Sequence, residues 1–482
     1  MSISALGRET LAYGVGGVAL RLLSLLLLPI LTNFLSPTEY GVVALLTALM
    51  AIAQPIFSLG SGALMGLVYF EADSNQEKAT VVWSTLVLHL AAAAVLLMSA
   101  YLVGPFIGSV TRVVDDYLNV VNLALVNCAL ANLSGDLMLW LQFERRLTRF
   151  LIASLGGAAA GGIVSVVSVT VFDLGVAGVI WGQVAANLFV FVVVTPELRN
   201  FGFGKLSLNV CWRLFKDGIP LLPAFVFLFI LMQSNRYILE AIDGLASVGI
   251  YSIGFSLGSA VGLVVNAVST AWFPFFMQYK EKPKEAEVVF GKVTTYYVIA
   301  LGFCCLTMAI FADTIVSLVV QSQFTGAAQV VGIVALSQAF LGLFTLLLPG
   351  MYFRNEVHFT AFIQGVAALV SLPFNYFLIK EWGVTGAGFG VLASSILLVS
   401  ATILWNQSRA TIYPRIRYEW SKMARITLLF ILVYITYLGL QKIELLPPFL
   451  LPIILIFSTL ALLFGQIDSV ERHSIRNWMG LT

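Results

Sequence analysis

Residues 11–35 read LAYGVGGVALRLLSLLLLPILTNFL, an apolar run with a single charged residue, Arg21, in its middle. A helix rises about 1.5 Å per residue and a hydrocarbon layer is about 30 Å thick, so Arg21 would lie about 15 Å from either edge. A cation at that depth costs about 2.5–3.5 kcal/mol on insertion scales unless water or a partner solvates it. The run therefore predicts a membrane-spanning helix with one polar side.

That polar side can be traced by spacing residues about 100° apart around the helix. One arc carries small and hydroxylic residues together with the arginine: Gly14, Gly17, Arg21, Ser24, Leu28 and Thr32. The large residues Leu22, Leu23, Leu26 and Ile30 lie elsewhere. This arrangement is typical of a helix with one side on a water-filled cavity, which makes Arg21 a candidate binding site for an anionic substrate. The alternative is a structural arginine, paired with a neighbouring acid or with helix-end carbonyls.

The composition of the whole chain fixes its class. Of 482 residues, 60% are hydrophobic and 10% are charged, and the mean hydropathy is +0.96. Such values predict a polytopic membrane protein. The net charge of +2 does not suggest a nucleic-acid partner. The four cysteines show no ligand or disulfide spacing, so we expect no metal site, no cofactor and no disulfide.

Apolar stretches of about 20 residues recur along the chain and predict about 14 transmembrane helices. They fall near 11–33, 42–65, 81–103, 117–139, 151–172, 176–195, 214–235, 248–270, 291–312, 326–348, 359–379, 383–405, 423–440 and 447–466. Assigning the connections to alternate sides places 21 Lys and Arg residues on the side of the N-terminus and four on the other. This positive-inside bias predicts that both termini are cytoplasmic.

The sequence also contains an internal repeat. GVAGVIWG at 175–182 returns as GVTGAGFG at 383–390, an offset of 383 − 175 = 208. Gly41 and Gly249 keep this offset, as do Arg146 and Arg354. The repeat predicts an all-α integral membrane protein with two six-helix lobes in parallel pseudo-symmetry, followed by two extra C-terminal helices. The corresponding domains are residues 1–200 (helices 1–6), 201–410 (helices 7–12) and 411–482 (helices 13–14 and a cytoplasmic tail).

Three segments carry a family resemblance: RETLAYGVGGVALRLLSLLLLPILTNFLSPTEYGVVALL at the start, NRYILEAIDGLASVGIYSIGFSLG at 235–258, and the GVxGxxxG turns. They resemble the polysaccharide-export branch of the multidrug/oligosaccharidyl-lipid/polysaccharide exporter superfamily, in particular flippases of the O-antigen type. The likeness runs through helices 1–12. The last two helices lie outside this likeness. Lipid II flippases also have such an extra pair, which is thought to hold the lipid tail.

This resemblance implies a function and a location. The implied protein is a two-lobed transporter of the bacterial inner membrane that translocates polyprenyl-pyrophosphate-linked oligosaccharide units from the cytoplasmic to the outer leaflet by alternating access. Its substrate would serve the assembly of a surface polysaccharide such as the O-antigen of lipopolysaccharide. The expected partners are the lipid-linked oligosaccharide and membrane lipid, with a polysaccharide polymerase and a chain-length regulator as further candidates.

Other polar residues within the predicted spans are candidate site residues. Asp136 shares an arc of about 140° with Asn119, Asn122 and Asn132, and this stripe must face the bundle or a cavity. Asp136 would bind substrate or couple an ion, or else it would snorkel to the nearby cytoplasmic helix end. His89 lies among alanines and would either pack as a hydrogen-bonded residue or handle a proton.

Two more candidates come from helix 2 and helix 7. Gln54 precedes Pro55, where a kink would free a carbonyl and let this segment line the cavity. Arg236, followed by Tyr237, closes the predicted span 214–235 at the outer face. The pair would either anchor the helix at the interface or contact a phosphate on the exit side.

Two other function classes remain to be weighed. A drug/cation antiporter of the same superfamily would require a buried carboxylate among its first helices, whereas helices 1–3 carry Arg21 and no acid within their spans. A membrane enzyme would require catalytic carboxylates or a metal motif on a sizeable loop, and no such motif is found. The sequence therefore favours an anionic cargo and a protein that is not an enzyme, with the antiporter as the alternative.

Overall fold

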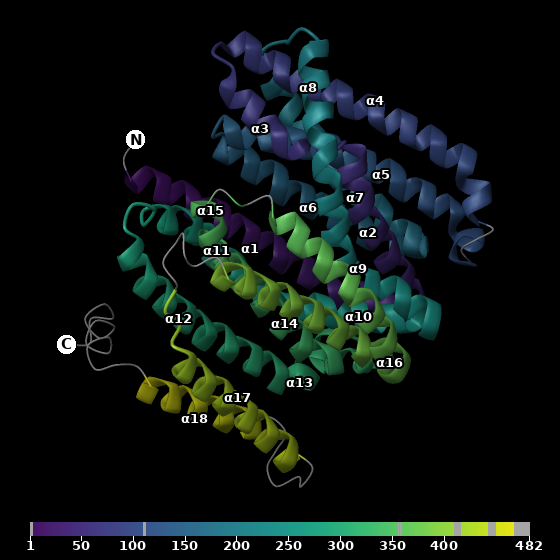
Figure 1. Ribbon diagram of the computed structural model, residues 1–482. Helices are drawn as coiled ribbons and strands as arrows, with labels where there is room; N and C mark the ends of the chain where they lie inside the picture. Colours follow the sequence, from purple (N-terminus) through teal and green to yellow (C-terminus); the bar gives the residue numbers. More distant parts are fainter. Residues whose placement is uncertain are drawn as a thin grey trace. The chain divides into compact units, whose positions relative to one another are not determined.

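The computed structural model describes residues 3–108, 112–354, 356, 359–408, 416–441 and 450–466, and every regular element within them is a helix (Figure 1). The elements in chain order are α1 (Ile3–Phe34), α2 (Pro37–Phe57), α3 (Gly62–Glu71), α4 (Asn75–Gly108), α5 (Arg112–Phe143), α6 (Leu147–Thr170), α7 (Gly175–Phe201), α8 (Leu208–Gly218), η1 (Ile219–Leu221), α9 (Leu222–Asp243), α10 (Leu245–Gly258), η2 (Ser259–Val261), α11 (Gly262–Met277), α12 (Pro283–Ile310), α13 (Ala312–Val319), η3 (Ser322–Ala327), α14 (Ala328–Leu347), α15 (Pro349–Phe353), α16 (Phe359–Ser408), α17 (Trp420–Gln441) and α18 (Leu450–Gln466).

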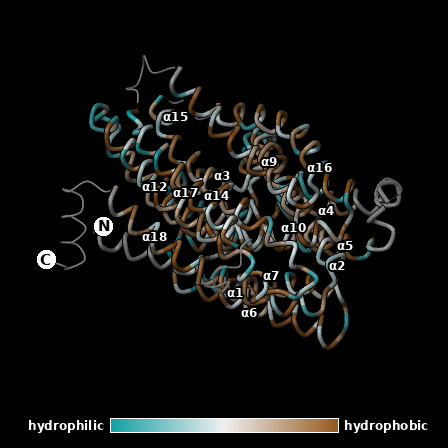
Figure 2. Tube along the Cα trace, turned by 90° about the horizontal axis from the view of Figure 1, so that it is seen from below, coloured by the Kyte–Doolittle hydropathy of each residue, from teal (hydrophilic) through white to brown (hydrophobic). Residues whose placement is uncertain are grey.

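The helices of the described chain account for the predicted number of spans. Eleven stretches are long and apolar enough to cross a membrane, and two shorter apolar helices, Ala19–Phe34 and Leu450–Leu463, add to them. The 48-residue stretch Phe359–Asn406 bends at Gly383, where φ is +51°, and so supplies two spans. Figure 2 shows apolar residues dominating the lengths of these helices. The described residues are thus consistent with about fourteen membrane helices, which confirms the fold class.

Two predicted spans have different ends in the structure. The predicted span 42–65 is interrupted, because α2 ends at Phe57 and α3 begins at Gly62. Leu59 and Gly60 between them have φ of +52° and +69°, a conformation that cannot continue a right-handed helix. The predicted span 214–235 is shifted, because α9 begins at Leu222 and runs to Asp243.

The break between α2 and α3 is packed against the junction of α8 and η1. A Cβ added to Gly60 would lie 2.3 Å from the carbonyl oxygen of Gly218, and one added to Gly218 would lie 2.5 Å from that of Leu59. These distances are far inside ordinary contact, so only glycines allow the two backbones to approach this closely. The break is therefore held by tertiary packing, which a hydropathy pattern does not register.

The internal repeat is visible in the positions of the helix starts. Helices α2 and α10 begin at residues 37 and 245, and α4 and α12 begin at 75 and 283, each an offset of 208. Gly175 and Gly383 both have positive φ, +48° and +51°. Three residues beyond them, a Cβ at Gly178 would meet α6 within 3.0 Å, and one at Gly386 would lie 2.0 Å from the carbonyl oxygen of Leu378.

The repeated arginines also make equivalent contacts, each within its own surroundings. Arg146 pairs with Glu197 near the end of α7. Arg354 donates from Nη2 to Oδ1 of Asn406, near the end of α16, at 2.9 Å. The partners also stand at nearly equivalent positions of the repeat, because adding the offset of 208 to position 197 gives 405, the position next to Asn406. Arg146 thus joins the turn before α6 to the end of α7, and Arg354 joins the turn before α16 to the end of α16.

Residue packing divides the chain into two compact units. The first comprises Met1–Ser256, Val319–Ala327 and Phe359–Ser394, and the second comprises Leu257–Leu318, Ala328–His358 and Ser395–Thr482. The domain bounds at residues 200 and 410 follow sequence symmetry instead of packing, and they stay a prediction.

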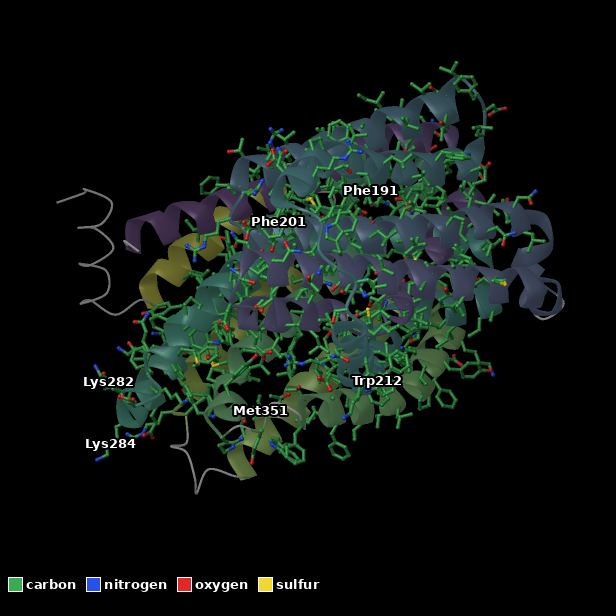
Figure 3. The ribbon with its side chains drawn as sticks, turned by 90° about the horizontal axis from the view of Figure 1, so that it is seen from above. Phe191, Phe201, Trp212, Lys282, Lys284 and Met351 are labelled. Carbon is green, nitrogen blue, oxygen red and sulfur yellow. The ribbon has the colours of Figure 1, made fainter. Side chains whose placement is uncertain are left out.

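Each unit has its own apolar core. In the first, Trp140, Met65 and Leu214 are fully buried, with Phe191 and Phe201 packed against them (Figure 3). In the second, residues of α11, α12 and α14 surround Trp272 and Phe290. Helix α17 packs on α12 and α18 through a smaller cluster of Leu306, Ile310, Tyr437 and Leu451.

Charged residues gather at helix ends. Lys282 and Lys284, at the start of α12, are exposed and extend away from the ribbon in Figure 3. At the end of α3, Arg213 of α8 donates to both carboxylate oxygens of Glu71, at 2.6 and 3.1 Å. These hydrogen bonds lower the pKa of Glu71. The pair joins α3 to α8 close to the contact between Gly60 and Gly218.

Candidate functional site

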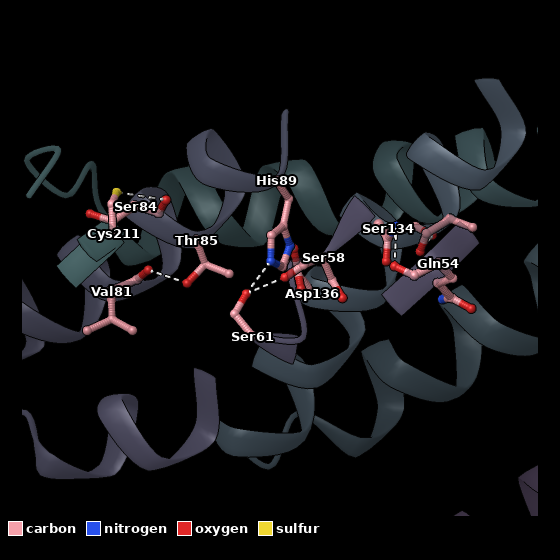
Figure 4. A network of polar contacts seen from close by, with 12 residues as sticks. Gln54, Ser58, Ser61, Val81, Ser84, Thr85, His89, Ser134, Asp136 and Cys211 are labelled. Carbon is pink, nitrogen blue, oxygen red and sulfur yellow. Dashed lines mark hydrogen bonds and ion pairs between the residues drawn. The ribbon is translucent and has the colours of Figure 1, made fainter. Parts of the chain in front are cut away.

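The first polar cluster joins the break after α2 to α4 and α5. Nδ1 of His89 lies 2.6 Å from Oδ2 of Asp136, and Nε2 of His89 lies 2.7 Å from Oγ of Ser61 (Figure 4). Ser61 Oγ in turn donates to the carbonyl oxygen of Ser58 at 2.6 Å. His89 is 1% exposed, Asp136 4% and Ser61 0%. The chain thus places a buried imidazole between a carboxylate and a hydroxyl.

This geometry bears on the snorkelling interpretation of Asp136. Helix α5 runs seven residues beyond Asp136, to Phe143, and the carboxylate points inward to His89 instead of reaching the helix end. The snorkelling interpretation is therefore wrong. A buried carboxylate is costly unless it is paired and hydrogen-bonded, and His89 supplies that partner.

Asn132, one turn before Asp136 on α5, forms a second hydrogen bond from α5 to the end of α2. Its Nδ2 donates to the backbone carbonyl of Gln54 at 3.2 Å, a carbonyl that also accepts from the N–H of Ser58 at 3.0 Å. The backbone carbonyl of Gln54 is thus hydrogen-bonded to α5. The Gln54 side chain itself is exposed, and Asn132 is buried. Asn119 and Asn122, the other members of the predicted stripe, are exposed.

A second polar network lies between α5 and α7, and the sequence reasoning missed it. Asn127 donates to Oε1 of Gln183 at 2.9 Å and accepts from Asn187 at 2.9 Å, and Ser134 donates to Asn187 at 2.7 Å. Asn127 and Ser134 are seven residues apart on α5, and Gln183 and Asn187 are four apart on α7. That shared helical spacing was a signal that could have predicted two facing polar stripes.

Arg236 forms a separate cluster on α9. It is 8% exposed, its Nε donates to Oγ of Ser252 at 3.4 Å, and its guanidinium lies 4.8 and 5.9 Å from the ring centres of Phe255 and Tyr251. Next to it, Tyr237 donates to the backbone carbonyl of Leu45 on α2 at 3.2 Å. Helix α9 continues seven residues past Arg236, so Arg236 does not close the span at an interface, and the anchor interpretation is wrong for this buried residue.

Arg21 lies on α1, thirteen residues before its end at Phe34, and is half-buried. Helix α1 packs along α6, where Leu27 lies against Gly162. Leu22 and Leu26 are 53% and 67% exposed, as expected for residues off the polar arc. The arc itself is mixed, because Leu28 and Thr32 are buried whereas Gly17 and Ser24 are exposed.

Near the start of α2, a pair of repeat-related glycines brings two helices into backbone contact. A Cβ at Gly41 would lie 2.0 Å from the carbonyl oxygen of Leu245, and one at Gly249 would lie 2.0 Å from that of Pro37. Helices α2 and α10 therefore touch at equivalent points near their first turns. Within the described residues, no group of three or more His, Cys, Asp or Glu side chains is arranged to hold a metal ion.

Solved structures share this fold. A lipid II flippase, MurJ, in an inward closed conformation is 11% identical, with a TM-score of 0.74 over 94% of this chain and 98% of that one. An inward-facing multidrug resistance MATE family transporter of the MOP superfamily is 14% identical, with a TM-score of 0.63 over 81% and 95%. A Vibrio cholerae MATE transporter in a bent form is 13% identical, with a TM-score of 0.55 over 84% and 97%.

The fold of this chain is shared with these transporters, and its apolar helices are those of a multi-pass membrane protein. A family model described as polysaccharide biosynthesis protein matches residues 6–280, more than half of the chain. The chain therefore belongs to the polysaccharide biosynthesis protein family, and the predicted resemblance is confirmed. No curated protein sequence matches it.

Proposed function

We propose that this protein is a flippase that moves polyprenyl-pyrophosphate-linked oligosaccharide units from the cytoplasmic to the outer leaflet of the bacterial inner membrane. The family match supports a role in polysaccharide biosynthesis, and the MurJ-like fold supports a lipid-linked cargo. The division of 21 basic residues against four supports an orientation with both termini in the cytoplasm. In this orientation α2 and α10 begin on the outer side.

The observation that carries the proposal is the environment of Arg236. Its described contacts are a serine hydroxyl and two aromatic rings, all of them uncharged at neutral pH. A guanidinium has five N–H donors in a planar fork that suits phosphate oxygens, and burial strengthens its attraction for an anion. A pyrophosphate that crosses the hydrocarbon layer needs such a cation where bulk water is poorest.

Arg21 supplies a second candidate cation. It lies about 20 Å along the axis from the end of α1, which is mid-membrane for a helix of this length. The pyrophosphate carries at least two negative charges, so two arginines at different depths would hold it at successive stages of translocation. Gln54, Asn132 and the amides between α5 and α7 provide neutral hydrogen-bonding groups for sugar hydroxyls.

The contact between Gly41 and Gly249 supports alternating access. In the proposed orientation it lies at the outer ends of α2 and α10, so it would close the exit side while the cytoplasmic side receives substrate. Opening would separate the two helices and expose the region around Arg236. Because the glycines are related by the repeat, the contact lies at a pseudo-symmetric position, where a rocking movement separates equivalent surfaces.

The remaining parts of the chain have proposed roles as well. Helices α17 and α18 expose a set of large apolar side chains, among them Leu428, Ile431, Ile435 and Phe457, and would contact the polyprenyl tail or membrane lipid. A polysaccharide polymerase and a chain-length regulator would receive the product at the outer leaflet. The family and fold matches are to transporters, which supports a protein without enzymatic activity.

The test is complementation of a flippase-deficient strain with variants of Arg236. We expect Arg236→Ala to abolish export with normal membrane accumulation, and Arg236→Lys to retain partial export, because lysine keeps the charge and loses the fork. Gly439→Ala is the matched control, since nothing lies within 4 Å of that glycine. Full export by Arg236→Ala would refute the cationic site.

A drug/cation antiporter is the second candidate, favoured by the likeness to MATE transporters and by the buried carboxylate of Asp136. An antiporter predicts a different deletion phenotype from that of a flippase. Deletion of the gene would sensitise cells to cationic drugs and leave surface glycan unchanged, whereas the flippase proposal predicts loss of glycan with unchanged drug sensitivity.

A further inference from the structure

We propose that Ser61, His89 and Asp136 form a binding site for one proton, and that the proton is coupled to the break between α2 and α3. The site follows from the geometry of the cluster alone. Its use to drive transport rests on the proposed function.

Counting hydrogens defines the loaded state. The carbonyl of Ser58 can only accept, so the single hydrogen of the Ser61 hydroxyl points to it across 2.6 Å. Ser61 Oγ is then an acceptor for His89, and Nε2 must carry a hydrogen. The 2.6 Å separation between Nδ1 and Oδ2 of Asp136 requires another hydrogen, because two lone pairs would repel. The pair therefore holds an imidazolium against a carboxylate, or the equivalent neutral acid and base, and is uncharged overall.

The unloaded state differs by the hydrogen on Nε2. When that proton leaves, Nδ1 keeps its hydrogen toward Asp136, and Nε2 becomes an acceptor. The Ser61 hydroxyl then rotates from the carbonyl of Ser58 to Nε2, so that every polar atom keeps a partner. The charge of the site changes from zero to −1 and no other bond is made or broken. One proton therefore switches one hydrogen bond at the break.

That hydrogen bond lies at a strained and tightly packed point of the chain. Ser58 is the C-cap of α2 and Ser61 is the N-cap of α3, and between them Leu59 holds a left-handed φ of +52°, a conformation that is strained for a non-glycine residue. Gly60 touches the backbone of Gly218, which leads through η1 into α9. A change at the break is thus passed to the helix that carries Arg236.

The other charged groups near this cluster are engaged elsewhere. Glu71 of α3 pairs with Arg213 of α8, which also lies 3.9 Å from Asp217. Glu144 of α5 accepts from Tyr69 at 2.6 Å. Lys216 of α8 is exposed, and Lys78 of α4 lies over the ring of Tyr69. Asp136 is therefore the charged group whose contact with His89 the structure describes.

The second copy of the repeat shows that the fold does not require this pair. At the offset of 208, His89 corresponds to Tyr297 of α12 and Asp136 to Phe344 of α14. Tyr297 satisfies its hydroxyl by donating to the carbonyl of Ala339 at 2.8 Å. The second copy thus carries an aromatic residue at each of the two positions, and the titratable pair is specific to the first copy.

The same three residue types also form the catalytic triad of serine hydrolases. Here Ser61 is 0% exposed and its hydroxyl points to a carbonyl of its own chain, so a substrate acyl group cannot reach it. Labelling of Ser61 by a fluorophosphonate would overturn the proton site in favour of a nucleophile.

The decisive experiment is nitrogen NMR of the purified full-length chain with isotope-labelled histidine. The sequence has three histidines, so replacing His358 and His473 by glutamine isolates His89. We expect Nε2 to lose its hydrogen in a single step over a range of pH values, and this step to be absent in Asp136→Asn, where the imidazole has no carboxylate to hold the proton. Nε2 that stays protonated, or stays unprotonated, throughout this range in the wild type would overturn the site.

A separate measurement tests whether the proton is coupled to the break between α2 and α3. Hydrogen exchange of the peptide containing Ser58 to Ser61 is compared between wild type and His89→Gln at each pH, which cancels the intrinsic pH dependence. We expect a pH-dependent difference that follows the loss of the Nε2 hydrogen in the NMR series, and equal exchange at all pH values would overturn the coupling. Neither measurement needs a substrate, so a failure of the flippase proposal in complementation remains distinguishable.

Discussion

The contact between Gly41 and Gly249 predicts that one added methyl group shifts the protein toward an outward-open state. A Cβ at Gly41 lies 2.0 Å from the carbonyl oxygen of Leu245, whereas ordinary contact begins near 3.4 Å. The missing 1.4 Å must come from separating α2 and α10, because the obstacle is backbone and cannot rotate away. Overpacking of this kind costs about 1–3 kcal/mol.

That cost falls on the closed state alone if the contact opens during transport. The population of the closed state then drops by about 5- to 150-fold relative to the open state, since 1.4 kcal/mol corresponds to tenfold. Gly249→Ala should give the same shift through its contact with Pro37. The double variant should add little, because both methyl groups act on one contact.

The assay is the reactivity of a single cysteine toward a membrane-impermeant thiol reagent added from outside. Ser252, 4% exposed and next to Arg236, is the reporter position, as Ser252→Cys in a background without the four native cysteines. We expect labelling to rise at least fivefold when Gly41→Ala is added, and to stay unchanged with the control Gly439→Ala. Unchanged labelling in a folded Gly41→Ala protein, or loss of that protein from the membrane, would refute a gate at this contact.

Three further predictions follow from the sequence and the packing. Arg21→Ala should abolish complementation with normal expression while Arg21→Lys retains part of it, and failure of both variants to accumulate would make the arginine structural. Gly386→Ala should lower the yield of folded protein, because its Cβ would lie 2.0 Å from a backbone oxygen, whereas Gly439→Ala should not; equal yields measured by fluorescence size exclusion would contradict the close helix approach. Single cysteines at Ser408 and Asp313 should label from the cytoplasmic and outer sides respectively, and labelling from one side would contradict the topology.

Hydropathy and repetition were enough to predict the spans and their symmetry. The burial of about 20 consecutive apolar residues is a strong signal, so the number of spans survives even where individual ends are displaced. The repeat was equally readable, because Gly175 and Gly383 occupy backbone conformations that disfavour other residues. These features are local properties of the chain, and local properties can be read from sequence.

The pairing of polar side chains could not be predicted from the sequence. His89 and Asp136 were each identified, but their contact depends on the rotation of α4 against α5 and on a break that Gly218 stabilises from a distant part of the sequence. The break itself falls inside a stretch that is apolar on average, so averaging hydropathy over a span conceals it. Arg236 was misplaced for the same reason, since the end of α9 was taken from hydropathy instead of from packing.

Comparison of the two repeats separates residues that build the scaffold from residues that give it a function. The glycines at 175 and 383, and the arginines at 146 and 354, occur in both copies and make equivalent turns or contacts. The candidate site residues differ, because Phe229, Leu28 and Phe344 stand at the positions equivalent to Arg21, Arg236 and Asp136. In the other copy, the equivalent helix carries an apolar residue at each of these positions. We infer that the charged residues serve a task that only one copy carries out, and binding an anion and exchanging a proton are the two proposed tasks for which arginine and a histidine–aspartate pair are chemically suited.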